Sequence, residues 1–363
     1  MKKSNLFVQV ALSICFIAVL CSCNNCSKND KSKIAKNNIT FVDTADATNN
    51  FYDNAETKEL PMTPVTIAGE VENPGTVDFS ALPLHTVIVK ESALSGDSNK
   101  FIGAYRYDGY SLYDILNLIK VKKANKKEFD SKIDTYVQIE NAKGEMVNIS
   151  WGEFYYPNHL HEIIIAKSVM RIVPSKTKDL WPLPDACKLI VSSDLLTERN
   201  ISAPSKITVI SYPKSFKTVR GMKPIFSPVI KLYSENNLLD SFTKNPKNII
   251  EQTYPAIFYG RGRGIHSTEP FTGVMMKEVL AKYFKITQEN LRKGMFLVVA
   301  KDGYRAVFTF SELMNRNDQQ EVLLICHPEV NDNGIFKVFP ACDFFSDRAI
   351  KGISAVYFSD SSK

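Results

Sequence analysis

The sequence is poor in the features on which several common functions depend. Only 7 of its 363 residues are Cys, and the part expected to fold contains no Cys-x-x-Cys motif, which disfavours a structural zinc site or a redox pair. Lysines are scattered along a chain with a formal net charge of +6, so no basic cluster indicates nucleic-acid binding. The chain also has no sequence motif that combines a nucleophile with a base, and we predict no catalytic residues.

The N-terminus has the pattern of an export signal. Lys2 and Lys3 precede the apolar run Leu6–Leu20, which is too short for a membrane-spanning helix. The run ends in Leu20-Cys21-Ser22-Cys23. This order resembles the bacterial lipobox, with cleavage after residue 22 and acyl chains such as palmitate attached to Cys23. An ordinary secretory signal is the alternative interpretation.

Acylation of Cys23 predicts a bacterial lipoprotein, because several buried acyl chains anchor a protein firmly. Asn24 follows this cysteine, in place of the Asp that favours inner-membrane retention in enterobacteria. We therefore expect a cell-envelope protein on the outer membrane. Whether it faces the periplasm or the cell surface stays open.

Composition divides the rest of the chain into segments. Residues 23–61 are rich in Asn, Lys, Asp, Ser and Thr, a composition that cannot bury enough apolar surface to fold, so they predict a flexible tether. We expect a first domain at 62–213, a basic connector at 214–226 and a second domain at 227–360.

The two expected domains share a series of landmarks. Tyr107–Leu116 and Phe271–Leu280 both contain an aromatic residue, any residue and Gly, followed by apolar residues at helical spacing. Further pairs follow in the same order: Gly144 and Gly303, Glu153 and Glu312, and the segments Asp194–Ile201 and Asp343–Ile350. Matching landmarks with similar gaps predict an internal repeat.

Apolar patterns predict an α+β fold with mixed sheets and short helices. In the second half we expect a helix over Met275–Phe284 and strands over Phe296–Ala300 and Val307–Phe310. The Asp302-Gly303 pair between these strands is a strong hairpin signal. In the first half, Ser92–Asn99 is polar and predicts a loop.

The strand Val65–Val71, the following Pro-Gly turn, a short Leu-Pro helix and the aromatic-x-Gly helix resemble the molybdopterin-binding fold of sulfite-oxidase-type enzymes. The resemblance covers Val65–Ile210 and, more loosely, Val229–Phe358, where Arg348–Ile353 is similar to the closing strand of that family. It implies two tandem copies of that fold.

One departure bears on function. In that family a cysteine thiolate binds molybdenum in a loop that corresponds here to Lys90–Ala93 and Tyr259–Arg263, and neither segment contains Cys. Thiolate is a soft ligand that Glu or Ser does not replace. We therefore expect no retained cofactor and a non-catalytic ligand-binding or assembly module. The alternative is a molybdopterin-dependent oxidoreductase whose metal has a non-Cys ligand.

The segment Gly260–Gly264 predicts an anion site. Alternating glycines allow backbone N–H groups to converge, and Arg261 and Arg263 can bind phosphate or carboxylate bidentately. With His266 they form a hypothetical site for an anionic small molecule, the alternative being a solvated turn. An envelope protein is the other partner that we consider.

Other candidates carry weaker signals. His159 and His161 have a spacing that metals use, but with no third ligand nearby in the sequence we predict no metal site. His327 beside Cys326 predicts no catalytic dyad, since neighbours in a strand face opposite sides. Cys326 and Cys342 are either a disulfide or two separate thiols. The remaining candidates are tyrosines that either contact a ligand or pack in the core: Tyr105, Tyr107, Tyr110, Tyr113, Tyr155 and Tyr156.

Overall fold

The structure is a computed structural model that describes residues 52–96, 98–326 and 335–360. The predicted signal peptide, Cys23, His327 and most of the predicted tether lie outside these residues. Every described residue belongs to one compact unit, Thr44–Lys363. Within the described ranges, no helix has the length and apolar character needed to cross a membrane.

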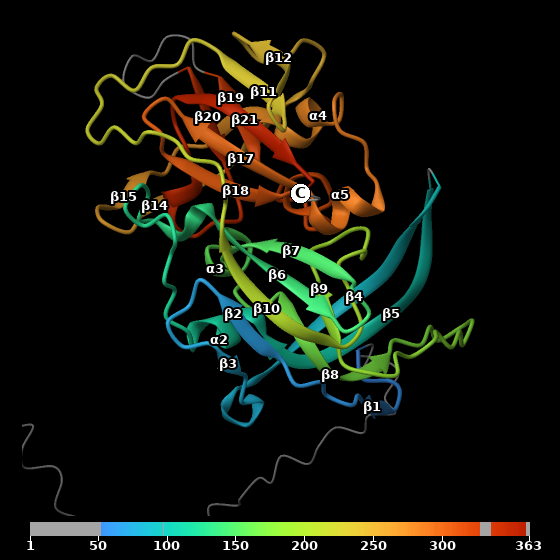
Figure 1. Ribbon diagram of the computed structural model, residues 1–363. Coiled ribbons are helices and arrows are strands. Elements are labelled where there is room, and N and C mark those ends of the chain that lie inside the picture. The colour runs from blue at the N-terminus through green and yellow to red at the C-terminus, as the bar shows by residue number, and fades with distance from the viewer. Residues whose placement is uncertain (1–51, 97, 327–334, 361–363) are drawn as a thin grey trace, which may run out of the picture. The chain divides into compact units, whose positions relative to one another are not determined.

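The chain up to Ser211 forms two five-stranded sheets (Figure 1). In the first sheet β8 pairs with β1, β5 and β9, and β5 also pairs with β4, so that β4 and β5 form a long twisted ribbon. Its strands are β1 (Thr57–Glu59), β4 (Leu84–Ser95), β5 (Ser98–Ser111), β8 (Ile163–Arg171) and β9 (Lys188–Val191). The second sheet has the order β3 (Gly75–Thr76), β2 (Thr66–Gly69), β10 (Pro204–Ser211), β6 (Thr135–Asn141) and β7 (Met146–Ser150).

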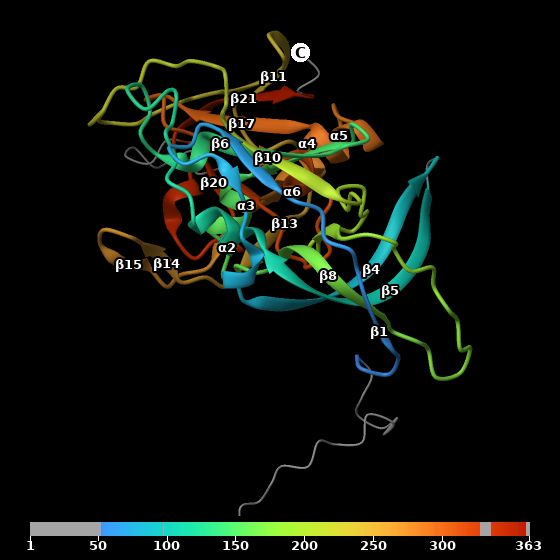
Figure 2. The same ribbon diagram turned by 60° about the horizontal axis from the view of Figure 1, so that its bottom comes forward.

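The remaining strands form a third sheet, a fourth sheet and a separate hairpin. The third sheet has the order β12 (Asn237–Phe242), β11 (Ile230–Ser234), β21 (Ile353–Ser359), β17 (Met295–Ala300) and β18 (Arg305–Thr309). The fourth has the order β13 (Glu251–Tyr254), β16 (Phe271–Met275), β19 (Leu323–Cys326) and β20 (Phe336–Phe339). The hairpin, visible in Figure 2, consists of β14 (Phe258–Gly260) and β15 (Gly264–Ser267).

The second and third sheets share one pattern of strand direction. In each, the first strand that the chain contributes to the sheet pairs in parallel with the last one, as β2 does with β10 and β11 with β21. That last strand then pairs antiparallel with the first strand of a hairpin, β6–β7 in one case and β17–β18 in the other. The two halves of the unit therefore have the same order of elements around these sheets.

In the part of the chain that the structure describes, helices are few and short. They are α2 (Leu112–Asn117), α3 (Trp151–Tyr155), α4 (Met276–Leu280), α5 (Gln288–Lys293) and α6 (Phe310–Met314), with 3₁₀ turns η1 (Phe79–Ala81), η2 (Lys132–Asp134) and η3 (Ser346–Arg348). Hydroxyl groups cap several of them, and Ser111 accepts a hydrogen bond from the backbone N–H of Asp114 at the start of α2. Such caps fix where a helix begins.

The predicted fold class is wrong. The structure is 43% strand and 12% helix, with small sheets arranged like the blades of a four-bladed propeller, and not an α+β fold of two sulfite-oxidase-type copies. The predicted helix Met275–Phe284 is shortened at both ends to α4 (Met276–Leu280), because Met275 belongs to β16 and pairs with β19, and residues 281–283 form a turn. A Cβ at Gly273 would lie 2.6 Å from the Leu324 carbonyl oxygen, so glycine permits this close pairing. Sheet pairing thus sets the residue at which this helix begins.

Two buried arginines lie at matching places behind α3 and α6. Arg199 donates hydrogen bonds to Asp194 (Nε to Oδ2, 2.8 Å) and to Glu153 (Nη1 to Oε2, 2.9 Å), and all three side chains are buried. The second cluster consists of Arg348, Asp343 and Glu312. Buried charges of this kind are tolerated only when each is paired.

The two clusters are linked by the residues that cap the helices. Ser150, the N-cap of α3, donates to Glu312 Oε2 at 2.8 Å. Thr309, the N-cap of α6, donates to Glu153 Oε2 at 3.0 Å. Each half therefore supplies a hydroxyl to the glutamate of the other, and this reciprocal contact joins the halves through polar groups that are excluded from water.

Candidate functional sites

A cavity of about 780 Å³ lies where the β14–β15 hairpin meets the fourth sheet. The aromatic part of its wall comes from Phe258 on β14, Phe271 on β16 and Tyr304. Other lining residues are Ile225, His266, Ser267, Glu269, Pro270, Thr272, Asp302, Ile335, Lys337, Ser346, Asp347, Ala349, Ile350 and Lys351. Its size is typical of a small-molecule site, and its wall combines apolar with polar and charged side chains. We call it the Lys337 cavity.

Strand alternation directs Lys337 into this cavity. Phe336 and Val338, its neighbours on β20, are buried in the main core on the other face of the fourth sheet. The Lys337 Nζ lies 4.1 Å from the ring centroid of Phe258 and 4.3 Å from that of Phe271. No described residue forms a hydrogen bond or ion pair with this ammonium. A cation in contact with two aromatic faces but without a counter-ion can receive an anion from solution.

The surroundings make this ammonium energetically unfavourable. Burial lowers the pKa of Lys337 from 10.5 to about 8, and the nearby charge of Lys351 adds to the effect. Two acidic residues of the wall have partners of their own: Asp347 binds Arg261, with 3.2 Å between Nε and Oδ2, and Asp302 accepts from the Tyr304 backbone N–H at 3.0 Å.

The predicted anion segment is the turn of the β14–β15 hairpin. Arg261 is 57% exposed and forms an ion pair with Asp347, so an internal carboxylate occupies the position proposed for a ligand. Arg263 lies in the same turn, which places it outside the cavity wall. His266 does line the cavity, and its Nε2 packs so close to Gly260 that a Cβ there would lie 2.3 Å away.

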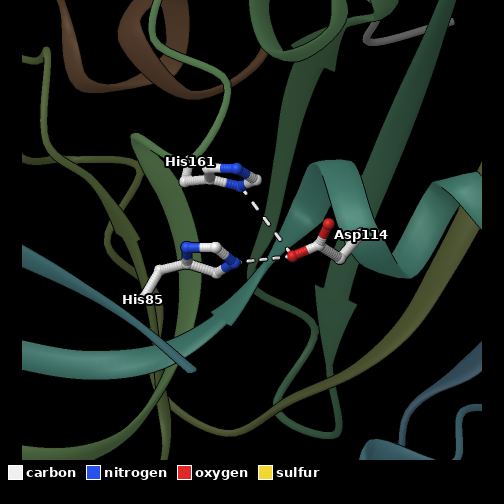
Figure 3. Close-up of side chains that lie close together, drawn as sticks. All are labelled: His85, Asp114 and His161. Carbon is white, nitrogen blue, oxygen red and sulfur yellow. Dashed lines mark hydrogen bonds and ion pairs between the residues drawn. The ribbon is translucent and has the colours of Figure 1, made fainter. Parts of the chain in front are cut away.

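A second candidate site joins three side chains from separate elements of the first half (Figure 3). His85 stands near the start of β4, Asp114 in the first turn of α2, and His161 in the turn that precedes β8. Pairing of β4 with β5 and of β5 with β8 brings these elements together. We call this group the His85 cluster.

Both imidazoles of the His85 cluster approach one carboxylate oxygen. Asp114 Oδ2 lies 2.7 Å from His85 Nε2 and 3.8 Å from His161 Nδ1. The rings are stacked with centroids 3.7 Å apart and an interplanar angle of 10°. Burial lowers the pKa of His161, and the adjacent His85 lowers it further, while Asp114 opposes both effects. A neutral imidazole, the form that binds metals, is thereby favoured at this position.

The hydroxyl nearest to the His85 cluster is not arranged as a nucleophile. Ser111 Oγ is 3.0 Å from His161 Nδ1, but it donates to Asp114 Oδ2 at 2.9 Å and caps α2. Ser111 is fully buried. In a catalytic triad the carboxylate binds the ring nitrogen opposite the one that faces serine, whereas here Ser111 and Asp114 both approach Nδ1. The arrangement does not support hydrolysis.

The other sequence candidates have ordinary positions. His159 is exposed in the loop before His161 and lies outside the His85 cluster. Cys187, Cys326 and Cys342 are free thiols, so Cys326 and Cys342 are not joined by a disulfide. Tyr105 and Tyr107 are buried in the core. The other tyrosines make ring contacts, which include Tyr110 with Phe79, Tyr113 with Tyr155 and His161, and Tyr155 with Tyr156.

The segment Lys90–Ala93, one of the two expected molybdenum positions, does not fit the ion. The segment Lys90–Ala93 belongs to β4 and not to an open loop. Glu91 is the one residue of this segment with a carboxylate that could bind a metal. It is buried, and it accepts hydrogen bonds from Lys188 Nζ at 2.7 Å and Tyr107 Oη at 2.9 Å. Cys187 is buried elsewhere, with its sulfur 3.4 Å from the Thr63 backbone nitrogen. This segment therefore offers molybdenum no free ligand.

Compared with family models and with curated proteins, the chain shows no match. Sequence reasoning missed Lys337, His85 and Asp114, and it considered His161 only with His159. The alternation of β20 was a usable signal for the direction of Lys337, but its aromatic neighbours come from β14 and β16, which are distant in the sequence.

Proposed function

We propose that this protein is a lipid-anchored cell-envelope protein that binds a small amphipathic anion in the Lys337 cavity. The observation that carries the proposal is the Lys337 ammonium, which lines the cavity, contacts two phenylalanine rings and has no counter-ion among the described residues. Buried charges in proteins are normally paired. A bound carboxylate, phosphate or sulfonate would supply the missing partner.

The rest of the wall supports a ligand with an apolar body. Phe258, Phe271, Ile225 and Ile350 offer apolar surface around the Lys337 ammonium. A purely polar anion would leave that surface in contact with water, whereas a neutral apolar compound would leave Lys337 unpaired. An aromatic or aliphatic body that carries one anionic group satisfies both requirements.

A pair of dyes that differ in one group tests the proposal. We expect 1-anilinonaphthalene-8-sulfonate to bind with an increase in fluorescence, and its uncharged analogue N-phenyl-1-naphthylamine to bind through apolar contacts alone. A hydrogen bond to a charged group contributes about 1.5–3 kcal/mol. Lys337→Met is therefore expected to weaken binding of the sulfonate about 10- to 100-fold and to change binding of the neutral dye little.

The matched control is Lys231→Met. Lys231 is also a strand lysine, but it lies exposed on β11 and outside the cavity wall. This variant should bind both dyes like the wild type. Equal affinity of the sulfonate for the wild type and for Lys337→Met would contradict the proposal. An equal loss of affinity for both dyes in a Lys337→Met protein that is still folded would also contradict it.

The membrane anchor is supported by the sequence Leu20-Cys21-Ser22-Cys23. We expect a clickable palmitate analogue to label the protein in bacterial cells and the label to disappear in Cys23→Ala. Cys26→Ala should keep the label, because Cys26 is beyond the lipobox. Labelling that persists without Cys23, or an unlabelled wild type, would refute the anchor while leaving the cavity proposal untouched.

A further inference from the structure

We propose that His85, Asp114 and His161 form a binding site for a divalent transition-metal ion, with Zn²⁺ as the best match. The three side chains offer two imidazole nitrogens and one carboxylate oxygen, and these ligand atoms all lie within 4.8 Å of one another. The site is separate from the Lys337 cavity, whose wall contains none of these residues. The inference is independent of the proposed function.

The distances fit the insertion of an ion with small movements. Zinc lies about 2.0–2.2 Å from nitrogen and oxygen ligands in proteins, which places tetrahedral ligand atoms about 3.4 Å apart. The observed separations from Asp114 Oδ2 are 2.7 Å to His85 Nε2 and 3.8 Å to His161 Nδ1. The first distance must lengthen by about 0.7 Å and the second shorten by about 0.4 Å. The two stacked imidazole rings must also tilt so that both nitrogens face the ion, and side-chain rotations can supply these movements.

The chemical nature of the ligands selects the class of ion. Two imidazoles and one carboxylate suit zinc and its transition-metal neighbours, whereas calcium and magnesium prefer oxygen ligands. In the apo protein the hydrogen bond between His85 and Asp114 holds a proton between the two groups. An ion would replace this proton and turn the contact into two metal–ligand bonds.

The surroundings hold the ligands yet leave access from solvent. Asp114 is fixed by the hydrogen bonds of Ser111, and the ring of Tyr113 contacts His161 edge-on at 5.7 Å. The side chains of His85, Asp114 and His161 are 22%, 18% and 39% exposed, so an ion can enter without unfolding the region. Three protein ligands leave a coordination position open, as in zinc sites that bind water or substrate.

A zinc titration of the chelator-treated full chain tests the site. We expect one Zn²⁺ per chain in competition with a chromophoric zinc indicator, and Co²⁺ should give the visible absorption of a tetrahedral site. His85→Ala and His161→Ala should each lower the affinity about 100-fold or more, because the loss of a supporting group outside the coordination sphere already costs 10- to 100-fold. Zinc should also raise the melting temperature of the wild type.

His159→Ala is the matched control, since His159 is exposed in the same loop but lies outside the cluster. It should bind zinc and be stabilised by zinc like the wild type. The proposal is overturned if the wild type binds no stoichiometric zinc. It is equally overturned if a folded His85→Ala/His161→Ala variant keeps the wild-type affinity, or if His159→Ala removes binding.

Discussion

Lys337→Met is expected to stabilise the protein near neutral pH by about 2 kcal/mol. Burial and Lys351 lower the pKa of Lys337 from 10.5 to about 8, and each pKa unit corresponds to about 1.4 kcal/mol, which gives a cost of roughly 3 kcal/mol for the charged form. Cation–π contacts with the rings of Phe258 and Phe271 offset about 0.5–1 kcal/mol of this cost each. Met has a similar length and no charge, so it removes the remaining cost.

The stabilisation has a defined dependence on pH. Because the folded-state pKa of Lys337 lies below the unfolded value, the cost is fully present below about pH 8, where lysine is charged in both states. It declines from about pH 8 to 10.5, where only the unfolded chain keeps the proton, and it disappears above that range. The wild type should therefore approach the stability of the variant as pH rises.

Urea unfolding at about pH 7 and about pH 10 measures this difference. The wild type, Lys337→Met and the exposed-lysine control Lys231→Met are compared at both values, so that other titrating groups cancel. We expect a gap of about 2 kcal/mol at the lower pH that largely closes at the higher one. A variant less stable than the wild type, or a gap that is equal at both values, would refute the physical account of Lys337.

Three further predictions concern the frame around the sites. Arg199→Met leaves two buried carboxylates unpaired and should lower the free energy of unfolding in urea by about 3–5 kcal/mol. Since burial already raises the pKa of Asp194 to about 6, this loss of stability should be larger at about pH 8 than at about pH 5. A loss that is independent of pH would contradict the unpaired-carboxylate explanation. Arg261→Ala removes an exposed ion pair and should lower the free energy of unfolding by at most about 1 kcal/mol without changing the affinity for the dyes. A large loss of sulfonate affinity would show that Arg261 belongs to the binding site. Gly260→Ala forces His266 to move and should lower the free energy of unfolding by about 1–3 kcal/mol. Gly262→Ala, with no atom near the added Cβ, should leave the stability unchanged. Equal effects of the two substitutions in thermal unfolding would contradict this packing argument.

Local patterns predicted elements whose signals lie close together in the chain. The strands predicted over Phe296–Ala300 and Val307–Phe310 correspond closely to β17 and β18, and Gly303 between them has a φ of +83°. A continuous apolar run and a turn that requires glycine are sufficient evidence for such a hairpin. The structure therefore confirms these strands and their turn.

Other predictions were wrong because they depended on strand pairing between segments that are distant in the sequence. Ser92–Asn99 was expected to be a loop because it is polar, but Ser92 pairs with Phe101 and the segment contributes to the β4–β5 ribbon. A two-stranded ribbon that extends into solvent can be polar on both faces, so its composition does not distinguish it from a loop. The fold class was wrong for a related reason, since a short helical pattern does not show that the residues just before it pair with a distant strand.

The paired landmarks of the sequence acquire a physical meaning only in three dimensions. Glu153 and Arg199 were noted as counterparts of Glu312 and Arg348, and the structure places both pairs in buried ion clusters. Spacing along the chain cannot show which charges meet or that they are buried. The same limit applies to the functional sites, whose members are separated by tens of residues and meet through sheet pairing.

The central claim is that the Lys337 ammonium is the partner of a ligand anion. A crystal structure of the protein with bound 1-anilinonaphthalene-8-sulfonate tests it most directly, because it locates the sulfonate. The account predicts a sulfonate oxygen about 3 Å from Lys337 Nζ and the naphthalene ring against Phe258 or Phe271. A dye bound elsewhere, or bound in this cavity with its sulfonate turned away from Lys337, would contradict the account.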